Sequence, residues 1–104
     1  MLHQVFSVFD SKSALYGFPY YSVSVPAGKR AFSDMCANPE TLINRHPGDF
    51  TLFHIGTYDD CTGQVTPFAS PESLGKAIEY IAAFERVRPS ETPQLDQQND
   101  EGDF

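Results

Sequence analysis

The sequence predicts a small α+β domain, in which two helices cover one side of an antiparallel sheet of three to four strands, followed by a disordered acidic C-terminal tail. Three observations give this class. Residues 2–10 and 50–60 are rich in the Val, Phe, Thr and Ile that strands favour. Residues 27–38 and 73–87 place their apolar side chains at helical spacing. Residues 89–104 contain only two large apolar side chains, too few to offset the entropy cost of ordering.

The N-terminal part is predicted as a strand followed by a long loop. Residues 2–10 form the strand, and the polar run from Asp10 to Ser13 turns the chain. Residues 13–30 are predicted to be irregular, with one short strand at 21–25, because Gly17 and Pro19 disfavour both a helix and a central strand.

Two helical segments come next. The first begins near Ala27, buries a face of apolar side chains and ends at Asn38, because the residue before a proline avoids the helical region. That buried face consists of Ala31, Phe32, Met35 and Cys36. A second, short turn over 39–44 is predicted to have Asn38 as its N-cap and Pro39 in its first position.

A hairpin and a helix complete the predicted domain. Residues 50–60 form its most regular strand, 59–63 the turn and 64–68 an edge strand that contains Pro67. Ser70 is predicted to cap a helix that runs to Val87. A single sheet with one open face often dimerises, so we expect a homodimer.

Length and charge indicate one domain over 1–88 and an acidic tail over 89–104. The net charge of the chain is −7, of which the domain, with seven bases and nine acids, carries −2 and the tail −5. The chain therefore has a nearly balanced body that can still bind a polyanion. No apolar run is long enough for a membrane span and no signal peptide is recognisable, so we expect a cytosolic protein.

The sequence gives little support to an enzyme, a cofactor or a metal site. His3, His46 and His54 lack metal-ligand spacing, and Asp59-Asp60 is typical of a turn. An enzyme would need one of these histidines to cluster with Asp59 or Asp60 around a pocket or a metal. Cys36 and Cys61 fit no zinc spacing and are expected to be reduced thiols, one packed and one in a loop.

The aromatic loop suggests binding of single-stranded nucleic acid, which requires rings that stack on bases and cations that contact phosphates. The candidate stacking residues are Tyr16, Phe18, Tyr20 and Tyr21, and the candidate phosphate contacts are Lys12, Lys29, Arg30 and Arg45. The alternative is that these rings cover the core or a dimer interface.

The end of the chain resembles the C-terminal tips of single-stranded DNA-binding proteins of bacteria and of some phages, which are acidic and end in Phe. The matching residues are Asp100, Glu101, Asp103 and Phe104. The resemblance implies that the tail competes with DNA or recruits a host or viral replication protein.

The stretches VFSVFDSK, RAFSDMCANPE, HPGDFTLFHIGTYDD and SLGKAIEY occur in this order within residues 2–80. They resemble the small non-structural protein of gokushoviruses, bacteriophages of the Microviridae with single-stranded circular DNA genomes. The resemblance implies a replication-associated phage protein in the host bacterial cytoplasm, outside the mature capsid and without an established catalytic site. Residues 83–104 depart from it.

Together these observations predict a non-enzymatic protein that binds single-stranded DNA without strong sequence specificity. The alternative is a protein–protein regulator or an assembly or packaging helper that does not bind DNA directly, which the net charge of −7 favours.

Overall fold

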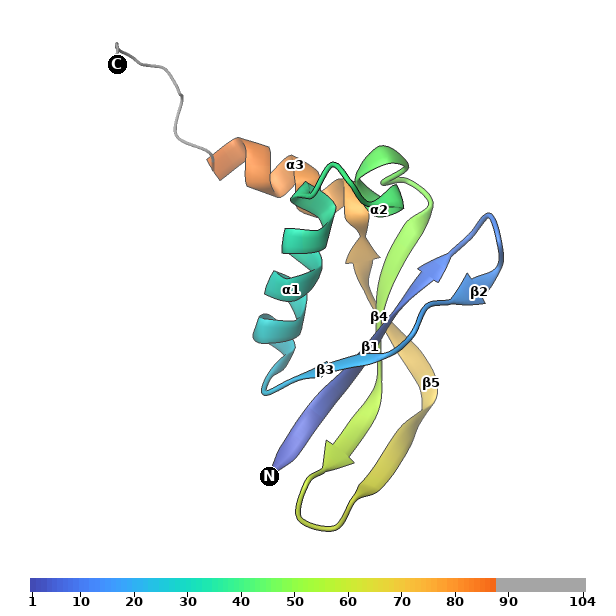
Figure 1. Ribbon diagram of the computed structural model, residues 1–104, viewed down its shortest axis with the longest axis vertical. Helices are drawn as coiled ribbons and strands as arrows, with labels where there is room; N and C mark the ends of the chain where they lie inside the picture. The colour runs from blue at the N-terminus through green and yellow to red at the C-terminus, as the bar shows by residue number, and fades with distance from the viewer. Residues whose placement is uncertain (88–104) are drawn as a thin grey trace.

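The computed structural model describes residues 1–87, including the side chains of residues 1–83. Its elements follow the order β1 (Leu2–Asp10), β2 (Leu15–Tyr16), β3 (Tyr20–Ser22), α1 (Val25–Ala37), α2 (Leu42–Arg45), β4 (Phe50–Asp59), β5 (Gln64–Lys76) and α3 (Ala77–Val87) (Figure 1). The predicted acidic tail over 89–104, including Asp100, Glu101, Asp103 and Phe104, lies outside the described residues.

The strands form one antiparallel sheet in the order β2-β1-β4-β5, and β3 also pairs with β1 beside β2. The α+β class is therefore confirmed, and β2 is the one strand that the prediction did not contain. We call the end of the sheet near Asp10, Phe50 and Lys76 the helical end, because α2 and α3 lie there. The opposite end, where the β4–β5 turn extends beyond the helices, is the hairpin end (Figure 1).

The core lies between one face of the sheet and helices α1 and α3. Phe6 and Leu52 contribute from the strands, Phe32 and Cys36 from α1, and Ala77 from the start of α3. Gly28 brings α1 close to the sheet, because a Cβ at this position would overlap the Phe6 ring. The prediction that Phe32 and Cys36 face the core is confirmed, and Ala31 and Met35 are partly buried beside them.

The predicted start of the last helix is wrong. Ser70 is not a helix cap, because β5 continues through Pro67 and Pro71 to Lys76 and α3 begins only at Ala77. The long strand β4 pairs with this segment up to Pro67 and again from Glu72 to Lys76, and two irregularities shift the register. Gly75, one residue before the end of β5, has φ +112°, a conformation that other residues rarely adopt.

Two further boundaries differ from the prediction. In the aromatic segment, β3 at Tyr20–Ser22 overlaps the short strand predicted at 21–25, and β2 at Leu15–Tyr16 was not predicted. Helix α1 begins at Val25, two residues before the predicted start at Ala27, with Ser24 as its N-cap. The short helix α2 is capped by Thr41, whose side chain accepts the Asn44 N–H at 3.1 Å. Asn38, the predicted cap, instead ends α1.

None of the helices within residues 1–87 is long and apolar enough to cross a membrane.

Candidate nucleic-acid interface

The sheet has a second face that the described helices do not cover. Side chains alternate along a strand, and in β1 Phe6 points toward Gly28 of α1. Val5 and Ser7 therefore point to the opposite side. We call this side the outer face, and it carries most of the exposed rings of the domain.

The rings at the helical end of the outer face form one contact group. Tyr16 of β2 lies 4.8 Å from Phe9 of β1 and 5.6 Å from Phe53 of β4, measured between ring centroids. Tyr16 remains 49% exposed. The three neighbouring strands thus present one aromatic surface to solvent.

A second group of rings lies at the hairpin end. Tyr21 is 5.7 Å from His3 and 5.9 Å from Tyr58 between ring centroids, and it is 62% exposed. His3 Nε2 is hydrogen-bonded to Asp60 Oδ2 at 2.8 Å. Hydrogen bonds from the Met1 ammonium and from His3 hold the pKa of the Asp60 carboxyl at about 2. This end of the outer face therefore carries a carboxylate.

An apolar groove separates the two ring groups. Its volume is about 410 Å³, and its floor includes Ser7 and Gly17. The Ser7 hydroxyl donates to the Gly17 carbonyl at 2.8 Å, so it does not need a ligand to satisfy it. The walls come from β2, the β2–β3 loop, β4 and β5, and they consist of Tyr16, Pro19, Ile55, Pro67, Phe68 and Pro71.

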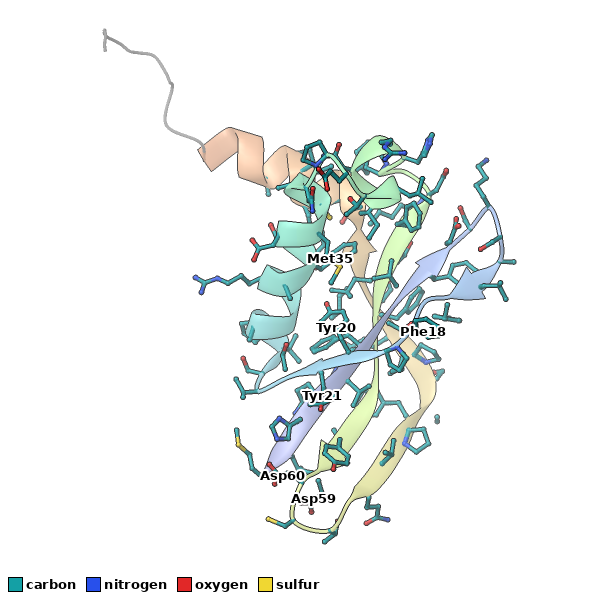
Figure 2. All side chains as sticks on the ribbon, viewed as in Figure 1. Phe18, Tyr20, Tyr21, Met35, Asp59 and Asp60 are labelled. Atoms are coloured by element: carbon teal, nitrogen blue, oxygen red, sulfur yellow. The ribbon has the colours of Figure 1, made fainter. Side chains whose placement is uncertain are left out.

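The predicted stacking residues divide between the two faces. Tyr16, Phe18 and Tyr21 are exposed, and Phe18 is 98% exposed. Tyr20 packs in the core instead, stacked on Phe6 at 5.3 Å with its hydroxyl donating to the Gly28 carbonyl at 2.8 Å. Burial raises the pKa of Tyr20 to about 12. Figure 2 shows Tyr20 between β3 and α1, and this packing takes Tyr20 out of the interface.

The residues predicted to contact phosphates are more widely separated in the structure than the predicted stacking residues. Lys29 and Arg30 are exposed on α1, and Arg30 lies on the side of this helix opposite Gly28 and Phe32, away from the sheet. Arg45 belongs to α2 and donates to the Glu40 carbonyl at 3.4 Å. Lys12 lies in the turn between β1 and β2, where it lines a shallow hollow with Asp10 and Asp49 at the helical end of the sheet.

The structure adds residues that the sequence analysis missed. Phe9, Phe53 and Tyr58 complete the two ring groups. Lys76 is exposed and pairs with Thr51, which pairs with Phe9, so the lysine belongs to the outer face. The alternation of side chains along β1 could have placed Phe9 on the same face as Val5 and Ser7. The position of Lys76 could not be predicted in this way, because β5 is longer than the sequence indicates.

The remaining polar candidates have structural explanations. His54 is buried and hydrogen-bonded to Gln4 at 2.9 Å. Asp59 accepts the Cys61 N–H at 2.9 Å, as expected for a turn. The ligand atoms of Asp59, Asp60 and Cys61 lie within 4.8 Å of one another, close enough to share a cation, but hydrogen bonds within the turn account for their arrangement. Cys36 is buried and Cys61 exposed, and both are free, as predicted.

The fold and the outer face define a small α+β protein with an exposed aromatic sheet surface. Residues 3–80 match the phage ORF5 protein family. Because this match covers most of the chain, the protein belongs to that family, which indicates a bacteriophage protein. No curated protein and no solved structure matches the chain.

Proposed function

We propose that this protein binds single-stranded DNA through its outer face during replication of a phage genome, without strong sequence specificity. The observation that supports this proposal most is the pair of solvent-exposed ring groups on a helix-free sheet face. Sheet aromatics of this kind stack on unpaired bases in other nucleic-acid-binding folds. In this proposal the protein has no catalytic role and needs no cofactor.

Stacking supplies affinity without sequence preference, because every base has a flat face. Each stacked base contributes on the order of 1–3 kcal/mol. Lys76 lies on the outer face at the helical end, and Lys12 lies in the β1–β2 turn at the same end of the sheet. Both would contact phosphates there. Asp60 places negative charge at the hairpin end, so we expect DNA to bind mainly toward the helical end.

The resemblance to gokushovirus non-structural proteins supports the biological setting. Progeny strands of a single-stranded DNA virus have to be bound as they form, in the host bacterial cytoplasm. We extend the proposal from the phage ORF5 family to this viral group on the four matching sequence stretches within residues 2–80.

The test is fluorescence anisotropy of a labelled poly-dT oligonucleotide, titrated with the full chain over a salt series. Lys76→Ala and Lys12→Ala should each lower the slope of log K against log salt by about 0.7, the contribution of one phosphate contact to single strands. Lys29→Ala is the matched control, because Lys29 is an exposed lysine on α1. An equal effect of Lys29→Ala, or the absence of binding at low salt, would refute the proposal.

The tail adds a regulatory component to the proposal. Asp100, Glu101 and Asp103 would compete with DNA for the cations, and Phe104 would anchor a replication partner. Replacing the three acids by Asn, Gln and Asn in the full chain should therefore tighten poly-dT binding. Unchanged affinity would leave partner recruitment as the role of the tail.

We further propose a homodimer, which would double the number of cations available to one DNA strand. Sedimentation equilibrium of the full chain tests this directly. A monomeric mass at all protein concentrations would refute the homodimer, and each protein molecule would then bind DNA through its own outer face alone.

The open edge of β5 favours a second candidate function, that of a protein–protein regulator or an assembly or packaging helper. Within the described residues β5 pairs only with β4, and residues 64–73 of this strand are all exposed. An unpaired edge can accept a strand from a partner, although Pro67 and Pro71 interrupt its row of donors. A protein that fails to bind DNA at low salt but captures a replication or packaging protein would have this function.

A further inference from the structure

The inference concerns Phe18, whose ring is the most exposed of the large apolar side chains in the described part of the chain. It is 98% exposed, so it makes almost no contact within its own chain. A ring in this position adds nothing to the stability of the domain through burial. Its exposure therefore needs an explanation outside the fold of one chain.

The backbone on both sides of Phe18 is firmly held. The Gly17 N–H donates to the Val8 carbonyl at 2.8 Å, and the Gly17 carbonyl accepts from the Ser7 hydroxyl at the same distance. On the other side, Pro19 has a fixed φ and Tyr20 is anchored in the core. The exposed ring thus stands on a fixed support, which lowers the entropy cost of using it for binding.

The apolar groove is formed in part by the segment that carries Phe18. Gly17 and Pro19, the two neighbours of Phe18 in the chain, both line it. Its volume of about 410 Å³ falls within the range of about 300–1,000 Å³ that is usual for small-molecule sites. This volume is sufficient for a nucleobase, which would contact Tyr16 and the proline side chains.

We propose that Phe18 inserts between two adjacent bases of single-stranded DNA and that one of these bases lies in the apolar groove. This inference rests on the proposed function and assigns to one residue the separation of neighbouring bases. Apolar side chains act as wedges between base steps in other DNA-binding proteins, where they unstack the step.

Charge favours DNA as the occupant of this site. No residue that lines the groove is acidic, and Lys76 and Lys12 lie toward the helical end, where phosphates would pass. The polar groups of the groove floor are already paired with each other. The groove would therefore hold a base by stacking and apolar contact, which is consistent with weak sequence preference.

The first experiment uses the fact that the chain contains no tryptophan. Phe18→Trp introduces one reporter at the wedge, and its emission should be quenched when bases stack on it. Leu15→Trp is the matched control, because Leu15 is 66% exposed one residue before Tyr16, and its partner Asp10 places it on the opposite face of the sheet. Saturation with poly-dT should quench the Phe18→Trp variant and leave the Leu15→Trp variant unchanged.

A second experiment uses the wild-type chain with an oligonucleotide that contains one 2-aminopurine next to adenine. Separation of the two bases should raise the 2-aminopurine emission on binding. Phe18→Ala should abolish this rise and weaken binding roughly 5- to 150-fold, the equivalent of one stacked base. Leu15→Ala should change neither quantity.

The outcomes separate the wedge from DNA binding itself. If the wild-type chain binds the oligonucleotide without a rise in 2-aminopurine emission, the wedge is refuted and the proposed function stands. If the wild-type chain binds no oligonucleotide, both are refuted. A blue shift of the Phe18→Trp emission with protein concentration alone would show the ring buried against a second copy, which would also refute the wedge.

Discussion

The two faces of the sheet use the same kinds of residue for opposite purposes. On the inner face, Phe6 is fully buried between Gly28, Tyr20 and His54. On the outer face, Phe9 lies three residues further along the same strand, where it is partly exposed and contacts the rings of Tyr16 and Phe53. The inner rings hold the helices to the sheet, and the outer rings remain available to a ligand.

This difference shows that composition is a poor guide to the role of an aromatic residue. Tyr20 and Tyr21 are neighbours in the chain, yet one is committed to the core and the other is exposed. The alternation of a strand, together with the position of the helices, decides which ring is structural.

The largest expected effect comes from comparing Phe6→Ala with Phe9→Ala. Phe6→Ala should destabilise the protein by about 3–5 kcal/mol, because it leaves a cavity in the core. Phe9→Ala should cost only about 1 kcal/mol, the value of a cross-strand aromatic contact, while weakening poly-dT binding. Urea unfolding followed by circular dichroism measures both costs. An equal loss of unfolding free energy in the two variants would mean that Phe9 stabilises the fold as much as a core residue and would contradict this comparison.

The packing of α1 on the sheet can be tested at Gly28. Gly28→Ala should destabilise by about 1–3 kcal/mol, since the added Cβ overlaps the Phe6 ring, despite the higher helix propensity of alanine. Gly48→Ala, where a Cβ meets nothing within 4 Å, is the control and should stay within about 0.5 kcal/mol. A smaller ring in the double variant Phe6→Leu with Gly28→Ala should recover part of the loss; additive costs would contradict the contact.

The two neighbouring tyrosines provide a smaller contrast. Tyr20→Phe should cost about 0.5–1.5 kcal/mol, because it removes the hydrogen bond to the Gly28 carbonyl. Tyr21→Phe should leave the free energy of unfolding unchanged.

The same pair predicts a dependence on alkaline pH. The pKa of Tyr20 is raised to about 12, so in the folded state this residue stays protonated while its unfolded form ionises from about pH 10. The contribution of Tyr20 is therefore complete below pH 10 and is lost as the pH rises to about 12. Thermal unfolding over this range should show a steeper loss for wild type than for Tyr20→Phe, and parallel curves would contradict the assignment.

The smallest perturbation is chemical labelling of the two cysteines. Burial raises the pKa of the Cys36 thiol to about 11, while Cys61 is exposed in the β4–β5 turn. A thiol reagent should modify one cysteine in the native protein and two after denaturation. Cys61→Ser should remove the native reaction and leave stability unchanged. Native labelling in this variant would show that the region between α1 and the sheet opens readily.

The sequence was sufficient for the elements with a clear period. β1, α1 and β4 were predicted nearly at their observed bounds, because alternation or helical spacing persists through each of them. The sequence also placed Tyr16, Phe18 and Tyr21 in one aromatic segment, but it did not separate these exposed rings from the packed Tyr20. The start of α3 was not, because Ser70-Pro71-Glu72 is a good local helix signal that pairing with β4 overrides.

The sequence by itself therefore determined the α+β class, the inward face of α1, the two unpaired thiols and the presence of an aromatic segment. Only the tertiary structure decided that Tyr20 belongs to the core, that Lys29 and Arg30 lie away from the outer face, and that Phe9, Phe53 and Lys76 lie on it. The physical reason is that the role of a side chain on a sheet depends on register, bulges and the placement of helices. These are set by contacts between residues far apart in the chain, which local propensity does not encode.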